Sequence, residues 1–234
     1  MRMSASYSYD QAEVLSQTIL RHAKEVDARS LMDIGAGAGA VARVVSRDLA
    51  RYLAVEQNPT SVAALRKAGV AVLSATFPCE VPGRPFDMVV SSHSIPEGSV
   101  EMYEPFLAQA WAAVKPGGLF LVITFKGPVE SPIRKMAAEI LDRRYGDDLR
   151  YAEMLRLLGS YGTVAISVVT SHVRTLNFSD LEARFGGWFW KSQEQRAIAL
   201  PRLRDAMDSK FRSSSGEYDL TTPHTVIAVR RAEA

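Results

Sequence analysis

Short apolar runs alternate along the chain with longer segments in which apolar residues recur every three or four positions. The first pattern is typical of buried strands, and the second is typical of helices with one buried face. Strands are predicted at residues 30–34, 51–56, 70–73, 86–92, 119–125, 163–169 (an extension to 176 is left open) and 224–229. Helices are predicted at residues 11–26, 40–49, 61–68, 100–114, 132–145, 149–158, 181–190 and 193–211, the last interrupted at Pro201. Strands that alternate with helices predict an α/β fold with a largely parallel sheet.

A glycine-rich turn at residues 31–39 joins the first predicted strand to the next helix. Its three glycines let the backbone approach a ligand closely, and the helix start adds a positive dipole end beside that ligand. Gly35, Gly37 and Ala40 fit the dinucleotide pattern G-x-G-x-x-G/A, and Glu56 follows at a suitable distance for a ribose. Two classes of cofactor use such a turn: dinucleotides, which carry a pyrophosphate, and sulfonium cofactors.

Asp33, two positions before the first glycine, discriminates between these two classes. A carboxylate there repels a pyrophosphate, whereas a ligand with an ammonium and a sulfonium group is compatible with it. The sequence therefore favours a sulfonium cofactor. An NAD(P)-dependent oxidoreductase that uses the same turn is the alternative, although the chain has no recognisable Tyr-x-x-x-Lys pair.

Four segments in this order resemble the motifs of the class I S-adenosylmethionine-dependent methyltransferases. They are the glycine motif at 33–39, the acidic strand tip at 54–56, the fourth-strand segment at 86–91 and the Val-Lys-Pro-Gly-Gly turn at 114–118. The resemblance implies a seven-stranded, mostly parallel, doubly wound sheet with an N-terminal helix and helical insertions after strands 5 and 6. It also implies a single domain over residues 1–234, with a helical cap (1–29), a cofactor-binding core (30–125) and insertion helices with closing strands (126–234).

S-adenosyl-L-methionine is the cofactor that the resemblance implies. Glu56 would accept from both ribose hydroxyls, and Gln57 would border the adenine. Many relatives place an Asp after the third strand to hold the adenine amino group. This chain has Ser-Ala-Thr-Phe-Pro at 74–78, so Thr76 or the backbone near Phe77 is expected to replace it. The residues expected to contact the cofactor are Asp33, Gly35, Ala36, Gly37, Gly39, Glu56, Gln57, Thr76, Phe77, Ser92 and His93.

The acceptor site is expected from the N-terminal segment and from the turns and insertions after strands four to six. His93 lies in the turn after the fourth strand, where it is expected to be either a base or an orienting group for the acceptor. The other candidates for the substrate pocket are Tyr7, Tyr9, His172, Trp188 and Trp190. Alternative interpretations are left open: the tryptophans pack in the core, His172 lies on the surface, and the tyrosines belong to an irregular tail.

The residues after the fourth strand also bear on the kind of acceptor. Ser-Ser-His-Ser stands at 91–94, where methyltransferases of planar amino groups carry Asn/Asp-Pro-Pro-Tyr/Phe. The chain also lacks a cysteine pair for carbon-5 methylation of pyrimidines. We therefore expect O-, N- or C-methylation of a small molecule, with secondary metabolism as one setting. A catalytically silent partner subunit that binds S-adenosylmethionine is the second alternative, and the intact glycines argue against it.

Composition narrows the class of protein further. The chain has 234 residues, of which 47% are hydrophobic, so it can bury a sizeable core. Its formal net charge is only +2, which is not typical of a nucleic-acid-binding surface. Cys79 is its only cysteine, which excludes an intrachain disulfide. A cytoplasmic protein is expected, without a nucleic-acid or membrane partner and without a metal. Its oligomeric state is left open.

Overall fold

The computed structural model describes residues 6–96, 100–129, 131–141, 149–189 and 192–233. The chain divides into two compact units. The core unit comprises Ala12–Gly127, Asp148–Val169 and His224–Ala234, and the second unit comprises Met1–Gln11, Pro128–Asp147 and Thr170–Pro223. Strands β7 (Thr163–Thr175) and β8 (Tyr218–Arg230) contribute residues to both units. The single domain expected from the sequence stays a prediction.

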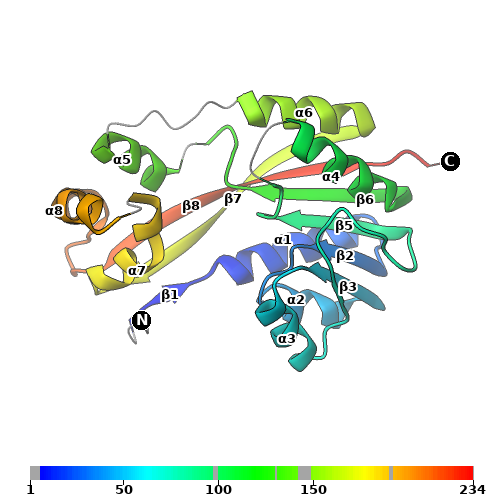
Figure 1. Cartoon of the computed structure of the whole chain (residues 1–234), viewed down its shortest axis with the longest axis horizontal. Helices are drawn as coiled ribbons and strands as arrows, with labels where there is room; N and C mark the ends of the chain where they lie inside the picture. The colour runs from blue at the N-terminus through cyan, green and yellow to red at the C-terminus, as the bar shows by residue number, and fades with distance from the viewer. Residues whose placement is uncertain (1–5, 97–99, 130, 142–148, 190–191, 234) are drawn as a thin grey trace. The chain divides into compact units, whose positions relative to one another are not determined.

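The core unit is built on a sheet with strand order β7-β8-β6-β5-β2-β3-β4 (Figure 1). Strands β2 to β6 pair in parallel, and β8 pairs antiparallel with β6. This order confirms the α/β class and the mostly parallel sheet expected from the sequence. The remaining strands are β2 (Ser30–Ile34), β3 (Arg51–Glu56), β4 (Val72–Ser74), β5 (Phe86–Ser92) and β6 (Val114–Thr124).

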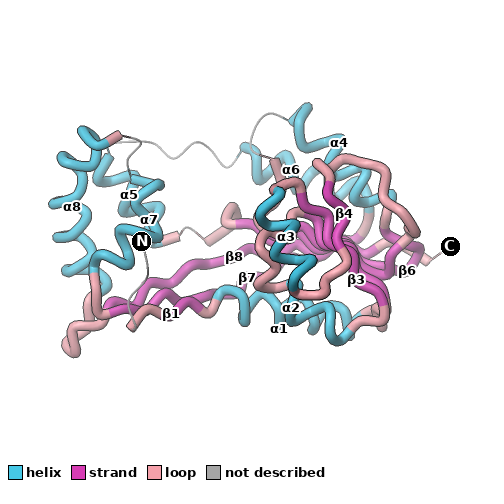
Figure 2. Tube along the Cα trace, turned by 60° about the horizontal axis from the view of Figure 1, so that its bottom comes forward, coloured by secondary structure: helices cyan, strands magenta, loops and turns pink. Residues whose placement is uncertain are grey.

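Helices cover both faces of this sheet, as in a doubly wound fold. One apolar cluster joins α4 and α6 to side chains such as Phe86 and Phe120, and the other joins α1, α2 and α3 to side chains such as Leu31 and Leu121. Parallel strands buried on both faces are apolar at nearly every position, which explains why β5 and the second half of β6 were readable from sequence. Helices α2 and α3 lie side by side in both ribbon views (Figures 1 and 2). The helices are α1 (Gln11–Glu25), α2 (Ala42–Val45), α3 (Pro59–Lys67), α4 (Val100–Ala112) and α6 (Leu149–Tyr161).

The second unit packs three helices on a smaller piece of sheet. Strand β1 (Ser8–Tyr9) pairs antiparallel with β7, placing Ser8 opposite Arg174. The helices are α5 (Pro132–Leu141), α7 (Phe178–Phe189) and α8 (Gln193–Phe211). Buried residues from these helices and from β7 and β8 form a separate apolar cluster: Ile133, Met136, Val173, Phe178, Leu181, Phe185, Leu203, Met207, Tyr218 and Leu220.

Two predicted helices differ from the structure. The helix predicted at 40–49 shrinks to α2 and a 3-10 turn at Ser46–Asp48, because Leu49 is already extended and leads into β3. A four-residue helix has a much smaller dipole than the predicted one, so the dipole contributes little at the glycine turn. Helix α8 runs through Pro201 without interruption. Leu200, just before the proline, packs against the second unit's apolar cluster, and Leu203 and Met207, after it, are buried in that cluster, so tertiary packing holds the helix on both sides of Pro201.

Two predicted strands begin earlier than the sequence suggested. Strand β6 starts at Val114, which pairs with Phe86, so the predicted turn at 114–118 belongs to the strand. Strand β8 starts at Tyr218 rather than at 224, and its first residues alternate between buried and exposed in steps of two. Over the described residues, the sheet has eight strands rather than the seven expected from the sequence, because β1 pairs with β7 at its edge. Strand β1 was not predicted, because two residues carry no periodicity.

Two absences hold for the described residues. No helix among them has both the length and the apolar character needed to cross a bilayer. No group of three or more His, Cys, Asp or Glu side chains in the same part of the chain could hold a metal ion.

Asp87 joins the amino ends of β2 and β5. Its Oδ2 accepts the backbone N–H groups of Arg29 and Ser30, at 2.9 and 2.7 Å, and the Ser30 hydroxyl at 2.7 Å. Its Oδ1 forms an ion pair with Lys115. Burial alone would raise the pKa of Asp87, but these donors outweigh burial and lower the pKa to about 2.

We expect Asp87→Asn to lower the free energy of unfolding by about 2 kcal/mol near neutral pH, because the pKa of Asp87 falls from 3.8 to about 2 on folding. A lowered pKa contributes stability above the unfolded value, and this contribution disappears as the pH falls through the folded value. The difference between parent and variant should therefore shrink between about pH 4 and about pH 2. Urea unfolding across this range measures it. Glu139→Gln, which breaks an ion pair with Lys210 whose side chains are half exposed, is the control and should change nothing.

Candidate active site

Two of the three glycines in the turn after β2 are required for different structural reasons. Gly35 has a φ of +73°, and a Cβ there would lie 2.4 Å from the Cβ of Ser94, so the turn after β5 packs directly on its backbone. Gly37 has a φ of +57°, and a Cβ there would meet no atom within 4 Å. Glycine at position 37 thus leaves an open face above the turn, where a ligand can lie against the backbone.

Glu56, at the end of β3, holds this turn from the neighbouring strand. Its Oε2 accepts the Gly37 N–H at 2.8 Å, and its Oε1 accepts the Asn58 N–H at 2.7 Å. Glu56 is only 8% exposed. A carboxylate offers about four acceptor positions, so two remain for hydroxyl groups such as those of a ribose. Because the Gly37 N–H is already donated, it is not directed at a pyrophosphate.

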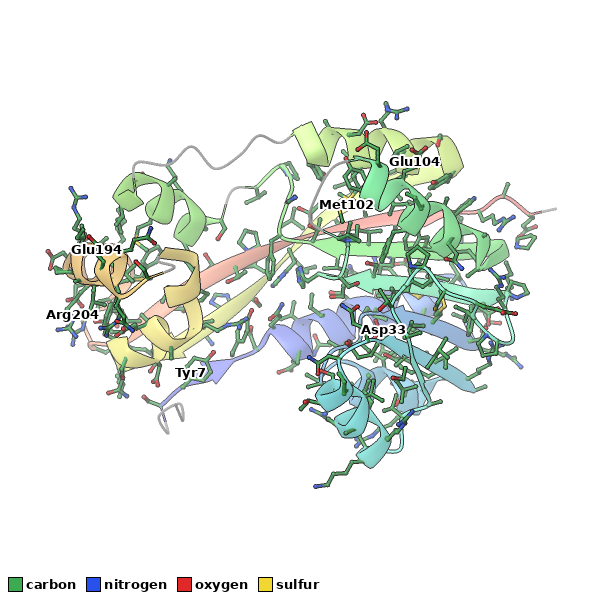
Figure 3. All side chains as sticks on the ribbon, in the orientation of Figure 1. Tyr7, Asp33, Met102, Glu104, Glu194 and Arg204 are labelled. Atoms are coloured by element: carbon green, nitrogen blue, oxygen red, sulfur yellow. The ribbon has the colours of Figure 1, made fainter. Side chains whose placement is uncertain are left out.

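Asp33 lies in β2 under the turn, at 5% exposure, among the side chains of the core unit (Figure 3). The hydroxyl of Tyr52, on the adjacent strand β3, donates to its Oδ2 at 2.5 Å. Burial raises the pKa of Asp33 to about 6; the Tyr52 hydrogen bond opposes this rise and the Glu56 charge adds to it. Tyr52 is a site residue that sequence reasoning missed. The available signal was its place on the strand next to Asp33.

The residues expected at the adenine side come together at the ends of β3 and β4. The Thr76 hydroxyl donates to Oε1 of Gln57 at 3.0 Å, and both side chains are exposed. The ring of Phe77 is half buried and lies edge-on to Phe106, with ring centroids 5.0 Å apart. In the structure, Thr76, hydrogen-bonded to Gln57, thus stands in the segment for which the resemblance implied an Asp.

His93 follows β5 in a left-handed conformation, with a φ of +55°, and its N–H donates to the carbonyl of Ile123 at 2.8 Å. Its ring stacks on Phe125 at a centroid distance of 3.7 Å, and its Nε2 lies 3.1 Å from Nδ1 of His224. The preceding residue, Ser92, is half buried and pairs with Ile123 in β6. The sequence analysis did not assign Phe125 and His224 to the site. The strand order places both there, because β8 runs antiparallel to β6 and its residues 224–225 lie beside the end of β6.

Ser94 connects the His93 turn to the glycine turn. Its hydroxyl donates to the carbonyl of Ile34 at 2.5 Å and lies 2.9 Å from the Ser91 hydroxyl. With the close approach to Gly35, these contacts tie the ends of β2 and β5 together. Asp33, the glycines, Glu56 and His93 therefore belong to one rigid edge of the core sheet.

The residues expected in the acceptor pocket fall in the second unit. Tyr9 lies in β1, where the Arg184 guanidinium is 4.7 Å from its ring centroid, and Tyr7 lies just before it (Figure 3). Burial raises the pKa of the Tyr7 hydroxyl. Nδ1 of His172, in β7, pairs with Oδ1 of Asp219 at 2.8 Å.

The pairing of β1 with β7 and the hydrogen bond from the Asp10 N–H to the His172 carbonyl place Tyr9 and His172 on adjoining strands. Trp190 and the side chain of Trp188 lie outside the described residues. The pocket therefore stays a prediction.

Residues 7–194 match a family model described as a methyltransferase domain. The chain belongs to this family. The match confirms the class I S-adenosylmethionine-dependent methyltransferase inferred from the sequence motifs, and S-adenosylmethionine is the expected cofactor. Around this site, the chain supplies acceptors at Glu56, a buried acid at Asp33 and an open backbone face at Gly37. These features fit a ligand with ribose hydroxyls and an ammonium group.

Several solved structures share this methyltransferase's fold. The YcgJ protein of Bacillus subtilis is 16% identical, with a TM-score of 0.59 over 94% of this chain and 99% of that one. A precorrin-6y C5,15-methyltransferase of Geobacter metallireducens GS-15 is 15% identical, with a TM-score of 0.55 over 93% and 88%. The N-methyltransferase NodS of Bradyrhizobium japonicum WM9 is 10% identical, with a TM-score of 0.55 over 96% and 99%. No curated protein matches the sequence significantly.

Asp33→Asn should make the stability of the methyltransferase less sensitive to pH. The folded pKa of about 6 exceeds the ordinary 3.8, so the folded parent binds this proton more tightly and loses stability as the pH rises between these values. We expect the free energy of unfolding of the variant, relative to the parent, to be about 3 kcal/mol higher at pH 8 than at pH 4. Urea unfolding of both proteins at the two pH values measures it. A difference that is the same at both would contradict the buried, ionisable state of Asp33.

Glu56→Gln should weaken the binding of S-adenosylmethionine. The amide cannot accept at both ends, so it disturbs the Gly37 turn and loses charge-assisted hydrogen bonds to the ribose. Each such bond contributes about 1.5–3 kcal/mol, so we expect a roughly ten- to several-hundred-fold loss of affinity by calorimetry. Glu80→Gln, at an exposed acid of the same unit, is the control. A folded Glu56→Gln protein with the parent's affinity would exclude a ribose contact.

Proposed function

We propose that the protein transfers the methyl group of S-adenosylmethionine to oxygen, nitrogen or carbon of a small-molecule acceptor. The observation that carries the proposal is the arrangement of Glu56, Gly37 and Asp33. It supplies hydroxyl acceptors, an open backbone face and a buried acid at one sheet edge. The small-molecule class is supported by the Ser-Ser-His-Ser segment at 91–94, which replaces the signature of enzymes that methylate planar amino groups.

Each residue has a distinct proposed part in binding. Glu56 accepts from the ribose hydroxyls, while Gln57 and Thr76 border the adenine. Asp33 compensates the charge of the ammonium group through the protein interior. The sulfonium supplies a methyl group that is already activated, so the chain's own task is alignment and exclusion of water.

His93 is the proposed contact with the acceptor. It follows β5 one residue before Ser94, which packs on the cofactor turn. An imidazole there can orient an acceptor hydroxyl or amine, or remove its proton when the acceptor is poorly ionised at neutral pH. The aromatic residues of the second unit, Tyr7 and Tyr9 among them, are proposed to contribute to the acceptor pocket.

The geometry argues against the nicotinamide alternative. A dinucleotide site directs backbone N–H groups and the start of a long helix at the pyrophosphate. Here the Gly37 N–H is donated to Glu56, and α2 has four residues. Asp33 adds a second carboxylate beneath the same turn.

Calorimetric titrations with S-adenosylmethionine, S-adenosylhomocysteine and NAD test the cofactor part of the proposal. We expect both adenosyl ligands to bind with about micromolar affinity, or roughly −8 kcal/mol, and NAD to show no binding. A panel of small phenols, amines and carbon acids then tests the acceptor part, with S-adenosylhomocysteine formation as the readout. Cofactor binding without turnover on any acceptor would favour a catalytically silent binding protein.

Variants of His93 test its proposed contact with the acceptor. His93→Ala should lower kcat by about 10²- to 10⁴-fold on an acceptor from the panel if the imidazole acts as a base. His93→Gln keeps a hydrogen-bonding group but cannot take a proton near neutral pH, so it separates orientation from proton removal. Cofactor affinity should stay close to that of the parent in both variants. An Ala variant with the parent's kcat would exclude a role for His93 in the reaction.

A further inference from the structure

His224 is a fully buried histidine that sequence reasoning left unassigned. It starts the part of β8 that belongs to the core unit. Because β8 runs antiparallel to β6 and β6 runs parallel to β5, this end of β8 meets the ends of β5 and β6. Three neighbouring strands thus bring His93, Phe125 and His224 together.

The His93 ring is held by two different contacts within this group. Phe125 stacks on its face with an interplanar angle of 14°, which restricts tilting of the ring. Nδ1 of His224 lies 3.1 Å from its Nε2, which distinguishes one ring flip from the other. The left-handed backbone at His93, uncommon outside glycine, sets the direction from which the side chain enters.

The contact between the two histidines also links their hydrogen positions. A neutral imidazole has one N–H donor and one acceptor nitrogen. A single hydrogen fits between Nε2 of His93 and Nδ1 of His224, so one ring donates and the other accepts. The tautomer of one histidine therefore fixes the tautomer of the other.

We propose that His224 is a positioning residue for methyl transfer: the buried His224 keeps one tautomer, and its Nδ1 thereby holds the His93 ring in one orientation and one tautomer. The inference rests on the proposed role of His93 toward the acceptor. A ring that is already oriented loses less freedom when the acceptor binds. His224 acts on the acceptor only through His93.

Nitrogen NMR of the parent protein tests the fixed tautomer directly. The chain has four histidines, at positions 22, 93, 172 and 224, so long-range proton–nitrogen spectra of histidine-labelled protein can be assigned by single substitutions. With S-adenosylhomocysteine bound, we expect the two His93 nitrogens to show the well-separated shifts of a single tautomer. Averaged shifts, as in a free imidazole, would overturn the proposal.

Two variants of matched shape separate the hydrogen bond from packing. His224→Asn keeps a polar atom close to the position of Nδ1, whereas His224→Leu has nearly the shape of Asn without a polar atom. We expect averaged His93 shifts in the Leu variant and a single tautomer in the Asn variant. A single His93 tautomer in a folded Leu variant would refute the positioning role. If the Leu variant does not fold, the spectra of the parent and of the Asn variant still test the proposal, because averaged His93 shifts in either would overturn it.

Calorimetry with S-adenosylhomocysteine on the same samples keeps this inference apart from the proposed function. Equal affinity in the parent and both variants is expected, because the contacts described for His224 are with His93 and Phe125. No binding to the parent would overturn the cofactor part of the proposed function. Normal binding together with averaged His93 shifts in the parent would overturn the inference alone.

Discussion

One buried carboxylate organises the cofactor edge of this protein. Glu56 accepts the N–H of Gly37, in the turn after β2, at 2.8 Å, and the N–H of Asn58, just after its own strand β3, at 2.7 Å. Asn58 in turn caps α3 by accepting from Thr60 and Ser61. A charge at the tip of β3 therefore sets the glycine turn, the start of a helix and the remaining acceptor positions together. The Gly37 N–H, which a nucleotide phosphate would need, is satisfied before any ligand arrives.

Asp33 lowers the stability of the fold when it is ionised. Its burial raises its pKa to about 6, so an ionised Asp33 weakens the fold at neutral pH. Tyr52 offsets part of this cost through its hydroxyl, while Glu56 adds repulsion. A positively charged ligand at the proposed site would offset the repulsion between the two acids. A residue that destabilises the fold is expected at positions where ligand binding, rather than folding, determines which residue is present.

Much of the core unit could be read from the sequence because its information is local. The runs at Ser30–Ile34, Arg51–Glu56 and Phe86–Ser92 are strands with the predicted bounds, since a parallel strand buried on both faces is apolar almost throughout. The partners of the site residues depend on the sheet instead. Tyr52 meets Asp33 across a strand pair, and His224 meets His93 from the far end of the chain. Composition and spacing do not encode such contacts, which follow from strand order and register.

The division of the chain suggests a route for directed evolution. The hydrogen bonds around the glycine turn, Asp33 and Glu56 are all internal to the core unit, whereas the aromatic candidates for the acceptor belong to the second unit. Gly127 ends one stretch of the core unit, and a Cβ there would collide with the Thr225 side chain, so this junction tolerates no substitution without repacking. Libraries confined to residues 170–223 would vary the second unit and leave the proposed cofactor contacts intact. Selection for new acceptors could then proceed on an unchanged proposed site for the methyl donor.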